Sequence, residues 1–351
     1  MKFCKNAYDF ITKKIKLSIL WVVRVLFAPC HFDVPLYKRI YYAIFGGFMP
    51  DQVALYNLNN NNKKEYLSEF DWYKSRYING DYSFILNNKL VCADLLKQYI
   101  RVPETICIKK KGVIYSSLYN INDYTGILYI LGVKKSLYIK PINVGKGLGV
   151  NKISVDNNNI YLDSNVITEK DLISFLDNRD NYFISECINQ SQFLNKIYDK
   201  TSNTIRLITI RNPKTNNCEV LYAVQRIGTK ETIPVDNGSK GGLVANIDIE
   251  TGILSSAKSI QKIVDFENHP DSGNPIKGTK IENWEELKNI FVNLMDNFPY
   301  LYFVAWDILI TDEGPVVIEA NTSSGVNIIQ LWGGQRNGKL GNFYRYHRII
   351  K

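Results

Sequence analysis

The segments of this chain that resemble strands gather in two blocks and do not alternate regularly with helices. Apolar, β-branched runs bounded by turn residues predict short strands within residues 105–163, including residues 126–130, and again within residues 204–249. Helical patterns surround these blocks, at residues 89–99, 169–176 and 284–297. A doubly wound parallel sheet needs regular alternation of strand and helix. The sequence therefore predicts an α+β protein with two α+β lobes, preceded by a helical N-terminal segment.

A strand–turn–strand unit near the C-terminus brings three oxygen-bearing side chains together. Two apolar runs, residues 306–310 and 316–321, enclose the turn cluster Thr-Asp-Glu-Gly-Pro, which is typical of a β-hairpin. Side chains two residues apart share a face of a strand, and the paired strand adds a third, which unites Asp307, Glu319 and Asn321. Carboxylate and amide oxygens are the ligands that Mg²⁺ prefers. On these residues alone, a surface hairpin with ordinary acidic residues is an equal alternative.

A lysine followed by a glycine-rich turn forms a second candidate site. A predicted strand ends at Lys140, and the next segment has glycines at alternate positions around a further lysine: Gly145, Lys146, Gly147 and Gly149. Such a turn lets backbone N–H groups approach an anion. A strand follows it instead of a helix, so it is not the helix-opening phosphate loop of other nucleotide-binding proteins.

Cysteine and histidine usage excludes several classes of site. The six cysteines are scattered without a C-x-x-C pair, which favours reduced thiols in the cytoplasm over a disulfide framework or a zinc site. The three histidines lie far apart in the sequence, so a histidine metal cluster or a Ser/His/Asp triad has little material.

The positive charge is concentrated at the N-terminus. The chain has a net charge of +9, and residues 1–50 hold eight Lys and Arg against two Asp, a net charge of +6. One helical face there carries Ile11, Ile15, Val22 and Leu26, and the other carries Lys13 and Arg24. The apolar run is too short to span a bilayer. Residues 1–28 therefore suit the anionic inner face of a membrane, or a helix that packs on the main body or on a partner subunit. Nucleic acid is not expected as a partner, since no RNA-binding signature accompanies the basic residues.

Five short segments, in order and spacing, resemble the ATP-grasp superfamily and most closely its sugar-transfer-associated family. They are Gly-Phe-Met-Pro at 47–50, Asn-Thr-Ile-Arg at 203–206, Asp236-Asn237 through Gly241-Gly242, His-Pro-Asp-Ser-Gly at 269–273 and Ile-Glu-Ala-Asn at 318–321. The resemblance spans roughly residues 47–335. It implies an ATP-grasp fold, in which two α+β lobes clamp ATP, and it implies ATP and Mg²⁺ as cofactors.

The resemblance also implies roles for individual residues. Lys140 and the upstream Lys89 would contact the ATP phosphates under the glycine-rich turn, and Asp307, Glu319 and Asn321 would hold the metal. The adenine would lie against the hinge formed by Glu186, Cys187 and Ile188. Ser185 stands where many relatives carry an acidic residue, so that contact is not implied here.

Arg206 and Arg226, with Asn237 before a Gly-Gly pair, resemble glutamate ligases that modify a ribosomal protein. In those enzymes the arginines face the γ-phosphate and the substrate carboxylate. Phosphoryl and acyl-phosphate oxygens need fixed cations around them, which agrees with this role. The alternative for each arginine is an ion pair at the end of a strand.

Four segments follow from these patterns. They are a basic amphipathic helical segment (1–46), a helical cap (47–110), a small lobe with the glycine-rich loop (111–190) and a large lobe with the metal site (191–340).

The resemblance implies an ATP- and Mg²⁺-dependent carboxylate–amine ligase that works through an acyl phosphate. It would attach an amino acid or similar amine to a sugar carboxylate, free or lipid-linked, in bacterial surface polysaccharide synthesis. We expect a cytoplasmic enzyme, peripheral on the inner face of the membrane if residues 1–28 bind there. The alternatives are a kinase acting on a sugar or glycolipid hydroxyl, and a non-catalytic membrane-associated scaffold.

Overall fold

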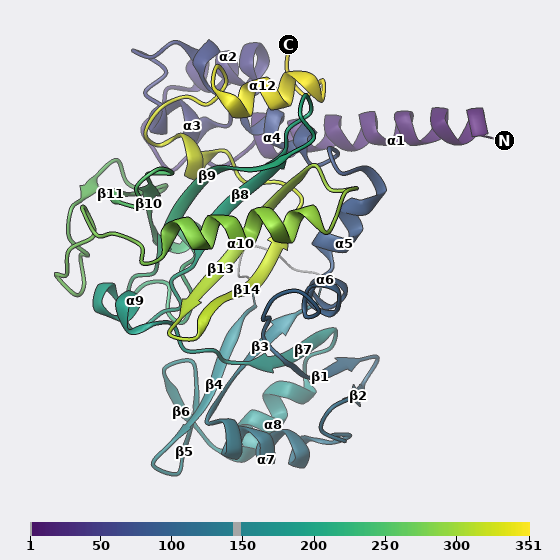
Figure 1. Cartoon of the computed structure of the whole chain (residues 1–351), viewed down its shortest axis with the longest axis vertical. Coiled ribbons are helices and arrows are strands. Elements are labelled where there is room, and N and C mark those ends of the chain that lie inside the picture. Colours follow the sequence, from purple (N-terminus) through teal and green to yellow (C-terminus); the bar gives the residue numbers. More distant parts are fainter. Residues whose placement is uncertain (1, 143–148) are drawn as a thin grey trace.

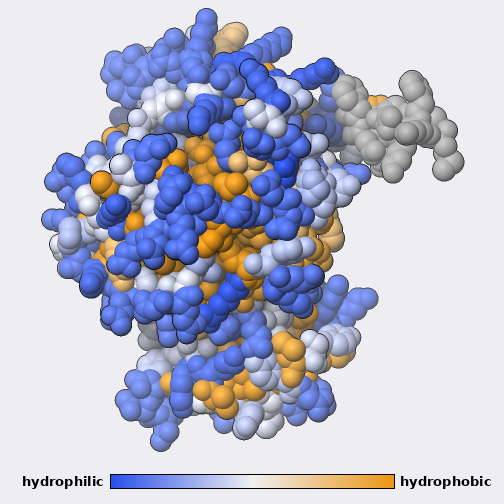
Figure 2. Space-filling view, viewed as in Figure 1, coloured by the Kyte–Doolittle hydropathy of each residue, from blue (hydrophilic) through white to orange (hydrophobic). Residues whose placement is uncertain are grey.

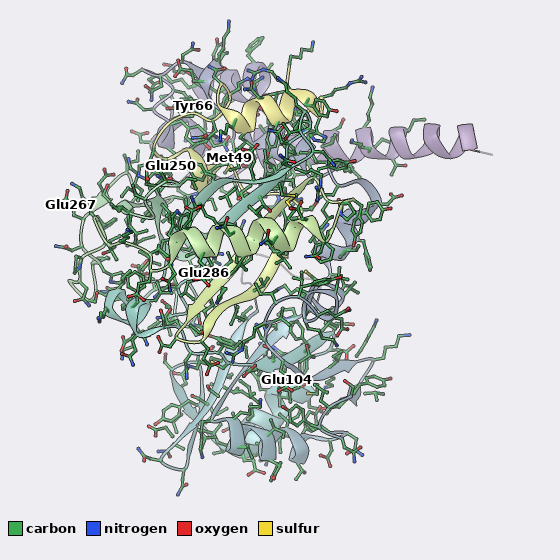
Figure 3. All side chains as sticks on the ribbon, viewed as in Figure 1. Met49, Tyr66, Glu104, Glu250, Glu267 and Glu286 are labelled. Carbon is green, nitrogen blue, oxygen red and sulfur yellow. The ribbon has the colours of Figure 1, made fainter. Side chains whose placement is uncertain are left out.

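The chain folds into two sheet-containing lobes stacked end to end, with a helical cap above the upper lobe (Figure 1). The computed structural model describes residues 2–142 and 149–351, with side chains from residue 11 onward. Within these ranges both sheets are seven-stranded and every strand pair is antiparallel. The α+β prediction is therefore confirmed. Glu104 lies in the lower lobe and Tyr66 lies in the cap (Figure 3).

The lower, smaller lobe is one curved sheet covered by two helices. Its strand order is β2-β1-β7-β3-β4-β5-β6. The strands are β1 (Thr105–Lys110), β2 (Val113–Tyr115), β3 (Ser136–Pro141), β4 (Asn151–Asp156), β5 (Asn159–Leu162), β6 (Asn165–Ile167) and β7 (Tyr182–Glu186). Helices α7 (Tyr124–Lys134) and α8 (Glu169–Asp177) pack apolar side chains on this sheet to form one core.

The predicted strand at residues 126–130 was wrong, because these residues lie inside α7. The Asp123 side chain accepts a hydrogen bond from the Gly126 backbone N–H (2.9 Å) and so caps the helix. The buried residues Ile127, Ile130 and Leu131 are spaced three and four apart, which a helix places on one side. A short apolar run fits a strand or a buried helix equally well, and the N-cap hydrogen bond of Asp123 is the local feature that favours the helix here.

The upper, larger lobe is built on a sheet with strand order β12-β11-β10-β9-β8-β13-β14. The strands are β8 (Ile205–Arg211), β9 (Cys218–Ile227), β10 (Leu243–Ile247), β11 (Leu254–Ser259), β12 (Asp265–Phe266), β13 (Phe303–Thr311) and β14 (Gly314–Asn321). Helix α10 (Trp284–Asp296) crosses one face of this sheet (Figure 1). The predicted C-terminal hairpin is β13–β14, with a register that pairs Asp307 with Glu319 and Ala305 with Asn321.

Side chains of the large sheet alternate strictly between its two faces near the site. On β13, Val304, Trp306 and Ile308 pack into the core with α10, whereas Phe303 and Ala305 pack on the opposite side. The period of two along a strand then places Asp307 on the face away from α10.

The C-terminal helices and part of the helical cap cover that second face. The described helices of the cap are α2 (Leu36–Gly46), α3 (Pro50–Leu55), α4 (Glu69–Ser75), α5 (Ser83–Asn87) and α6 (Lys89–Leu96). Helices α11 (Asn327–Gln330) and α12 (Lys339–Tyr346) join them. The buried Gln330 side chain links α11 to the cap, since it accepts from the Leu67 backbone N–H (2.8 Å) and donates to the Leu67 carbonyl (2.9 Å).

The first helix, α1 (Lys2–Trp21), runs into a short π-helical turn (Val22–Leu26) and projects from the body (Figure 1). The predicted apolar face is split: Leu26 packs on the cap, whereas Ile11 and Ile15 are exposed. A π-helical turn advances the chain by a different angle from an α-helix, so residues beyond it leave the original face. None of the described helices is both long and apolar enough to cross a bilayer.

Polar side chains cover most of the surface on view, with apolar residues gathered in a band across the middle of the molecule (Figure 2).

Candidate functional site

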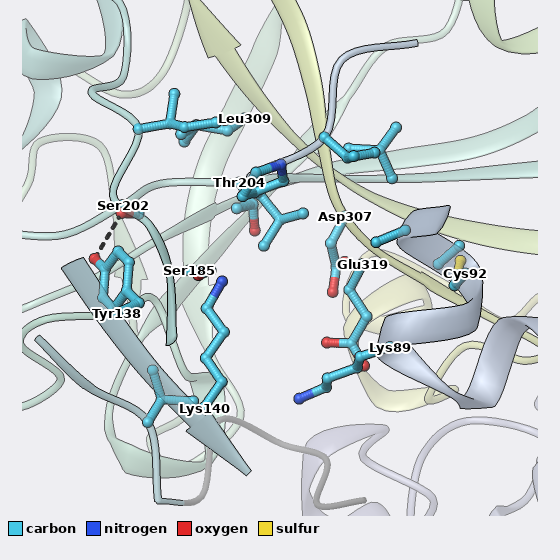
Figure 4. Close-up of a pocket in the computed structure, with 18 of the residues that line it drawn as sticks. Lys89, Cys92, Tyr138, Lys140, Ser185, Ser202, Thr204, Asp307, Leu309 and Glu319 are labelled. Atoms are coloured by element: carbon cyan, nitrogen blue, oxygen red, sulfur yellow. Dashed lines mark hydrogen bonds between the residues drawn. The ribbon is translucent and has the colours of Figure 1, made fainter. Parts of the chain in front are cut away.

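A deep pocket lies between the two sheets and receives side chains from both lobes and from the cap. It encloses about 1220 Å³ including its open mouth. The residues that matter for its chemistry are Lys89 from α6, Lys140 from β3, Glu186 and Ile188 after β7, Arg226 from β9, Asn237, and Asp307 and Glu319 from the hairpin. The close-up shows the two lysines and the two carboxylates facing one space (Figure 4).

Four neighbouring strands place a row of charged side chains on one face of the large sheet. Asp307 on β13 is the register partner of Glu319 on β14 and of Arg206 on β8. Arg226 on β9 lies two residues from Val224, the partner of Arg206, and so shares this face. The antiparallel register thus assembles four charges that are distant in the sequence.

Both arginines bind the Asp307 carboxylate. Arg206 donates from Nε and Nη2 at 2.5 and 3.0 Å, and Arg226 Nη1 lies 3.3 Å from Oδ2. Burial alone would raise the pKa of Asp307, but the two guanidinium groups outweigh it and lower the pKa. Asp307 therefore stays ionised and remains a competent oxygen donor.

Arg226 also pairs with a carboxylate that the sequence patterns did not single out as a site residue. Arg226 Nη2 lies 2.6 Å from Oδ1 of the buried Asp236. The other oxygen of Asp236 accepts from the backbone N–H (2.7 Å) and hydroxyl (2.6 Å) of Thr204. Asp236 thus fixes Arg226 against the start of β8. The only signal in the sequence was its place beside Asn237 in the Asp-Asn segment.

Lys140 lies in the pocket without an anionic partner among the described residues. Its nearest ring is Tyr138, whose centroid is 5.3 Å from Nζ. Burial, the positive charge of Lys89 and, in the opposite direction, the Glu319 carboxylate set the pKa of Lys140 at about 8, below its ordinary 10.5. An enclosed cation of this kind is suited to a phosphate.

Of the glycine-rich turn, Gly145, Lys146 and Gly147 lie outside the described residues. Gly149 is described and has a positive φ of 73°. A Cβ there would lie 3.0 Å from the Pro141 ring, so a side chain would be strained as well as crowded.

The segment after β7 forms one wall of the pocket. Glu186 and Ile188 line it, whereas Cys187 points to a neighbouring polar pocket. The Glu186 backbone N–H donates to the Glu104 carbonyl (2.9 Å), so a contact of the Glu186 backbone with a base would use its carbonyl oxygen. Tyr138 and Ser202, joined at 3.1 Å between hydroxyl oxygens, line both pockets (Figure 4).

Asn237 holds a tight loop at the edge of the pocket. Its side-chain oxygen accepts from the Ser239 backbone N–H (3.0 Å) and hydroxyl (2.9 Å). A Cβ at Gly242 would lie 2.8 Å from the Asp236 carbonyl oxygen, so the glycine permits the close approach of the two segments.

The side chains present fit a magnesium nucleotide. The hairpin offers two carboxylates and one amide on a single face, which is the oxygen donor set of Mg²⁺. Among the described residues no group of three acidic, histidine or cysteine side chains could hold a metal, so the Asn321 amide or phosphate oxygens would complete the shell. The enclosed Lys140 would supply positive charge to the phosphates of a bound nucleotide. Asn321 does not line the pocket itself but lies two residues from Glu319 on the same face.

Solved structures that resemble the chain are ATP-grasp and D-alanine ligases. The ATP-grasp ligase PsnB complexed with its minimal precursor is 14% identical, with a TM-score of 0.35, 70% of this chain covered and 56% of that chain. The VanG D-Ala:D-Ser ligase from Enterococcus faecalis is 15% identical, with a TM-score of 0.39 and coverages of 70% and 57%. D-alanyl-alanine synthetase A from Vibrio cholerae is 10% identical, with a TM-score of 0.44 and coverages of 76% and 66%. The chain thus spans between about half and two thirds of the length of these structures. No curated protein matches the sequence.

The sequence also matches the family model described as sugar-transfer associated ATP-grasp over residues 69–339, well over half of the chain. This match confirms the resemblance drawn from the short segments. The chain belongs to the sugar-transfer-associated ATP-grasp family, with the ATP-grasp fold of two α+β lobes and with ATP and Mg²⁺ as the cofactors of that fold.

Proposed function

We propose that this protein is an ATP- and Mg²⁺-dependent carboxylate–amine ligase. The observation that carries the proposal is the shared pocket: Lys140 from one sheet and Asp307 and Glu319 from the other line the same space. Arg206 and Arg226 stand beside these carboxylates, where a reacting carboxylate needs fixed positive charge.

In this scheme Lys89 and Lys140 bind the nucleotide phosphates, and Glu186, Cys187 and Ile188 hold the adenine. Asp307, Glu319 and Asn321 hold Mg²⁺, which shields the phosphate charge when bound. Arg206 and Arg226, with Asn237 fixing the adjacent loop, orient the acceptor carboxylate toward the γ-phosphorus. A carboxylate oxygen attacks that phosphorus and ADP leaves. The amine then attacks the acyl carbon and phosphate leaves with the original carboxylate oxygen.

Among the residues that the structure describes, the pocket offers no histidine that could act as the general base of a kinase beside an acceptor hydroxyl. His269 is buried away from the pocket, with Nε2 2.7 Å from the Gly228 carbonyl oxygen. His31 pairs with Asp51 in the cap, and His347 packs against Phe343. No histidine of the described residues lines the pocket.

For the substrate, we propose an amino acid or similar amine and the carboxylate of a sugar, free or lipid-linked, in bacterial surface polysaccharide synthesis. The family's association with sugar transfer supports this assignment. The protein would act in the cytoplasm, peripheral on the inner face of the membrane through residues 1–28.

An isotope experiment tests the mechanism. Pairs of uronic acids and amino acids are screened for ADP release, and the active acid is then labelled with ¹⁸O in its carboxylate. The proposal predicts one labelled oxygen in the released phosphate and an amide product by mass spectrometry. A stable phosphorylated sugar, or phosphate without label, would refute it. The matched control is Glu319→Gln, which should abolish both products.

A further inference from the structure

The outward face of α2 carries large apolar side chains and no charged residue. Its exposed positions follow the spacing i, i+1, i+4, i+5, i+8 and i+9, which is one side of a helix. They are Leu36, Tyr37, Ile40, Tyr41, Ile44 and Phe45. Ile44 is 54% exposed and Phe45 is 66% exposed, whereas Ala43 is buried against the body. A helix on the surface of a soluble domain normally turns its polar face outward.

The preceding segment also carries exposed apolar side chains. The Trp21 side chain donates to the Ala43 carbonyl (3.3 Å) and joins α1 to α2. The side chains of Ile15, Ile19, Val23 and Phe27 are also exposed, while Leu17 and Leu20 pack on the body. We call these four residues and the six of α2 the N-terminal apolar surface. Contiguous exposed apolar surface marks an interaction site, and the six side chains on one side of α2 form such a face.

Basic residues are frequent along the same two segments. Residues 11–46 contain Lys13, Lys14, Lys16, Arg24, Lys38 and Arg39 against the single acidic residue Asp33. Lys63 lies over the Tyr41 ring, 4.4 Å from its centroid, and donates to the Tyr41 hydroxyl (3.1 Å). Tyrosines and lysines beside aliphatic side chains form the amphipathic band that proteins place at a membrane–water interface.

We propose that α2 docks the N-terminal apolar surface on an anionic lipid bilayer, with Leu36, Ile40 and Ile44 entering the interface. The positive charge of the N-terminal segment favours an anionic bilayer over a second copy of the chain. A second copy of the chain would bring two segments of net charge +6 together, and like charges across an interface oppose association. Anionic headgroups neutralise the same charge, and the apolar side chains bury their area between them. The inference is independent of the chemistry in the pocket, and it extends the membrane contact proposed above for residues 1–28 to α2.

Vesicle sedimentation of the full-length protein tests the proposal. The variant pair Ile40→Gln/Ile44→Gln removes apolar area from α2 without changing the charge, and glutamine preserves the helix. The matched control is Tyr129→Gln/Val133→Gln, an i, i+4 pair on α7 of the small lobe that is 71% and 61% exposed. We expect the wild type to bind phosphatidylglycerol-containing vesicles. The α2 pair should bind at least about tenfold more weakly, as the loss of two large apolar side chains predicts. The α7 pair should bind like the wild type.

Two results would overturn the proposal. If the α2 pair binds as tightly as the wild type, and only Ile15→Gln/Ile19→Gln weakens binding, then contact occurs through α1 alone. If the wild type does not bind vesicles but forms a dimer, and the double substitution in α2 prevents that dimer, then a second copy covers this face instead. Nucleotide binding, measured on the same samples, should be unchanged in all three pairs, so failure of docking is separable from failure of the ligase assignment.

Discussion

Arg206 donates two hydrogen bonds to the carboxylate of Asp307, from Nε at 2.5 Å and from Nη2 at 3.0 Å, across the β8–β13 strand pair. Asp307 therefore has two kinds of partner in the proposed function: the arginines and a bound metal ion. Without a nucleotide it neutralises the arginines, and with Mg²⁺ bound it would share its charge with the metal. In the proposed function, Asp307 would link the two arginines that face the acceptor to the metal site.

Substituting Asp307→Ala should destabilise the protein as well as stop catalysis. The change leaves Arg206 and Arg226 largely buried beside an empty space, and removing one partner of a buried ion pair costs about 3–5 kcal/mol. Urea denaturation of the nucleotide-free protein measures the loss. Glu319→Ala, which has no ion-pair partner among the described residues, should cost less than about 1 kcal/mol. Equal stability of the two variants would contradict this role of Asp307.

Glu319→Gln is the cleaner test of the metal site. The side chain is half-buried and isosteric with glutamine, so the fold should be retained. Loss of one carboxylate ligand should raise the Mg²⁺ concentration for half-maximal turnover and lower turnover at least about 100-fold. Glu313→Gln, at the exposed turn of the same hairpin, is the control and should behave like the wild type. An unchanged Mg²⁺ requirement in Glu319→Gln would exclude it as a ligand.

The substitution Asp236→Asn should slow acceptor-dependent ADP release and leave nucleotide affinity almost unchanged. The change keeps a hydrogen-bonding oxygen for Thr204 but removes the charge that holds Arg226 at 2.6 Å. We expect nucleotide affinity within about threefold of the wild type. Acceptor-dependent ADP release should fall about 10–100-fold, as the misplacement of one positioning residue predicts. Asp236→Glu should recover part of the loss. An equal fall in nucleotide affinity would indicate a general structural role instead.

Local patterns in the sequence were enough to predict the hairpin and the shared face of its three oxygen-bearing side chains. The turn between β13 and β14 and the period of two along each strand place Asp307, Glu319 and Asn321 on one face. The pairing of Arg226 with Asp236 could not be predicted, because it depends on how the loop after β9 folds back against Thr204. Long-range contacts of this kind leave no periodic signal.

Periodicity also failed to show which way a helical face points. The apolar positions of α2 have the spacing of a buried face, yet they lie outward. In α1 the apolar residues divide between the cap and the solvent: Leu17 and Leu20 pack on the cap, whereas Ile11 and Ile15 are exposed. A repeat defines a face, but the neighbouring elements decide whether it is covered. The helix at residues 124–134 was missed for a related reason, since its cap lies outside the apolar run.

The protein should lose stability on mild acidification, in part through His269. Burial lowers the pKa of His269 below its ordinary 6.5, although the Gly228 carbonyl and Asp271 act in the opposite direction. Between the lowered pKa and 6.5 the unfolded chain binds more protons, so the free energy of unfolding rises with pH across this window and is flat above it. Burial lowers the pKa of His347 as well. In His269→Gln the slope of unfolding free energy between about pH 5 and 6.5 should be smaller than in the wild type. An identical slope would show that His269 is not buried in its neutral form.

Nucleotide affinity should fall as the pH rises through about 8, the pKa of Lys140. Below this pH the amine is charged and attracts phosphate, and above it the attraction is lost. The pKa is depressed by burial and by Lys89, so a bound polyphosphate should raise it again, and binding near pH 8 should take up a proton. Calorimetric titration with ADP and Mg²⁺ in buffers of different ionisation enthalpy measures that uptake directly. Lys140→Arg, which stays charged at every pH used, should bind with a weaker pH dependence and without proton uptake. Lys140→Met should bind at least about tenfold more weakly at pH 7 because one charge-assisted contact is lost. Proton release on binding, or a pH dependence that survives in Lys140→Arg, would assign the titration to another group.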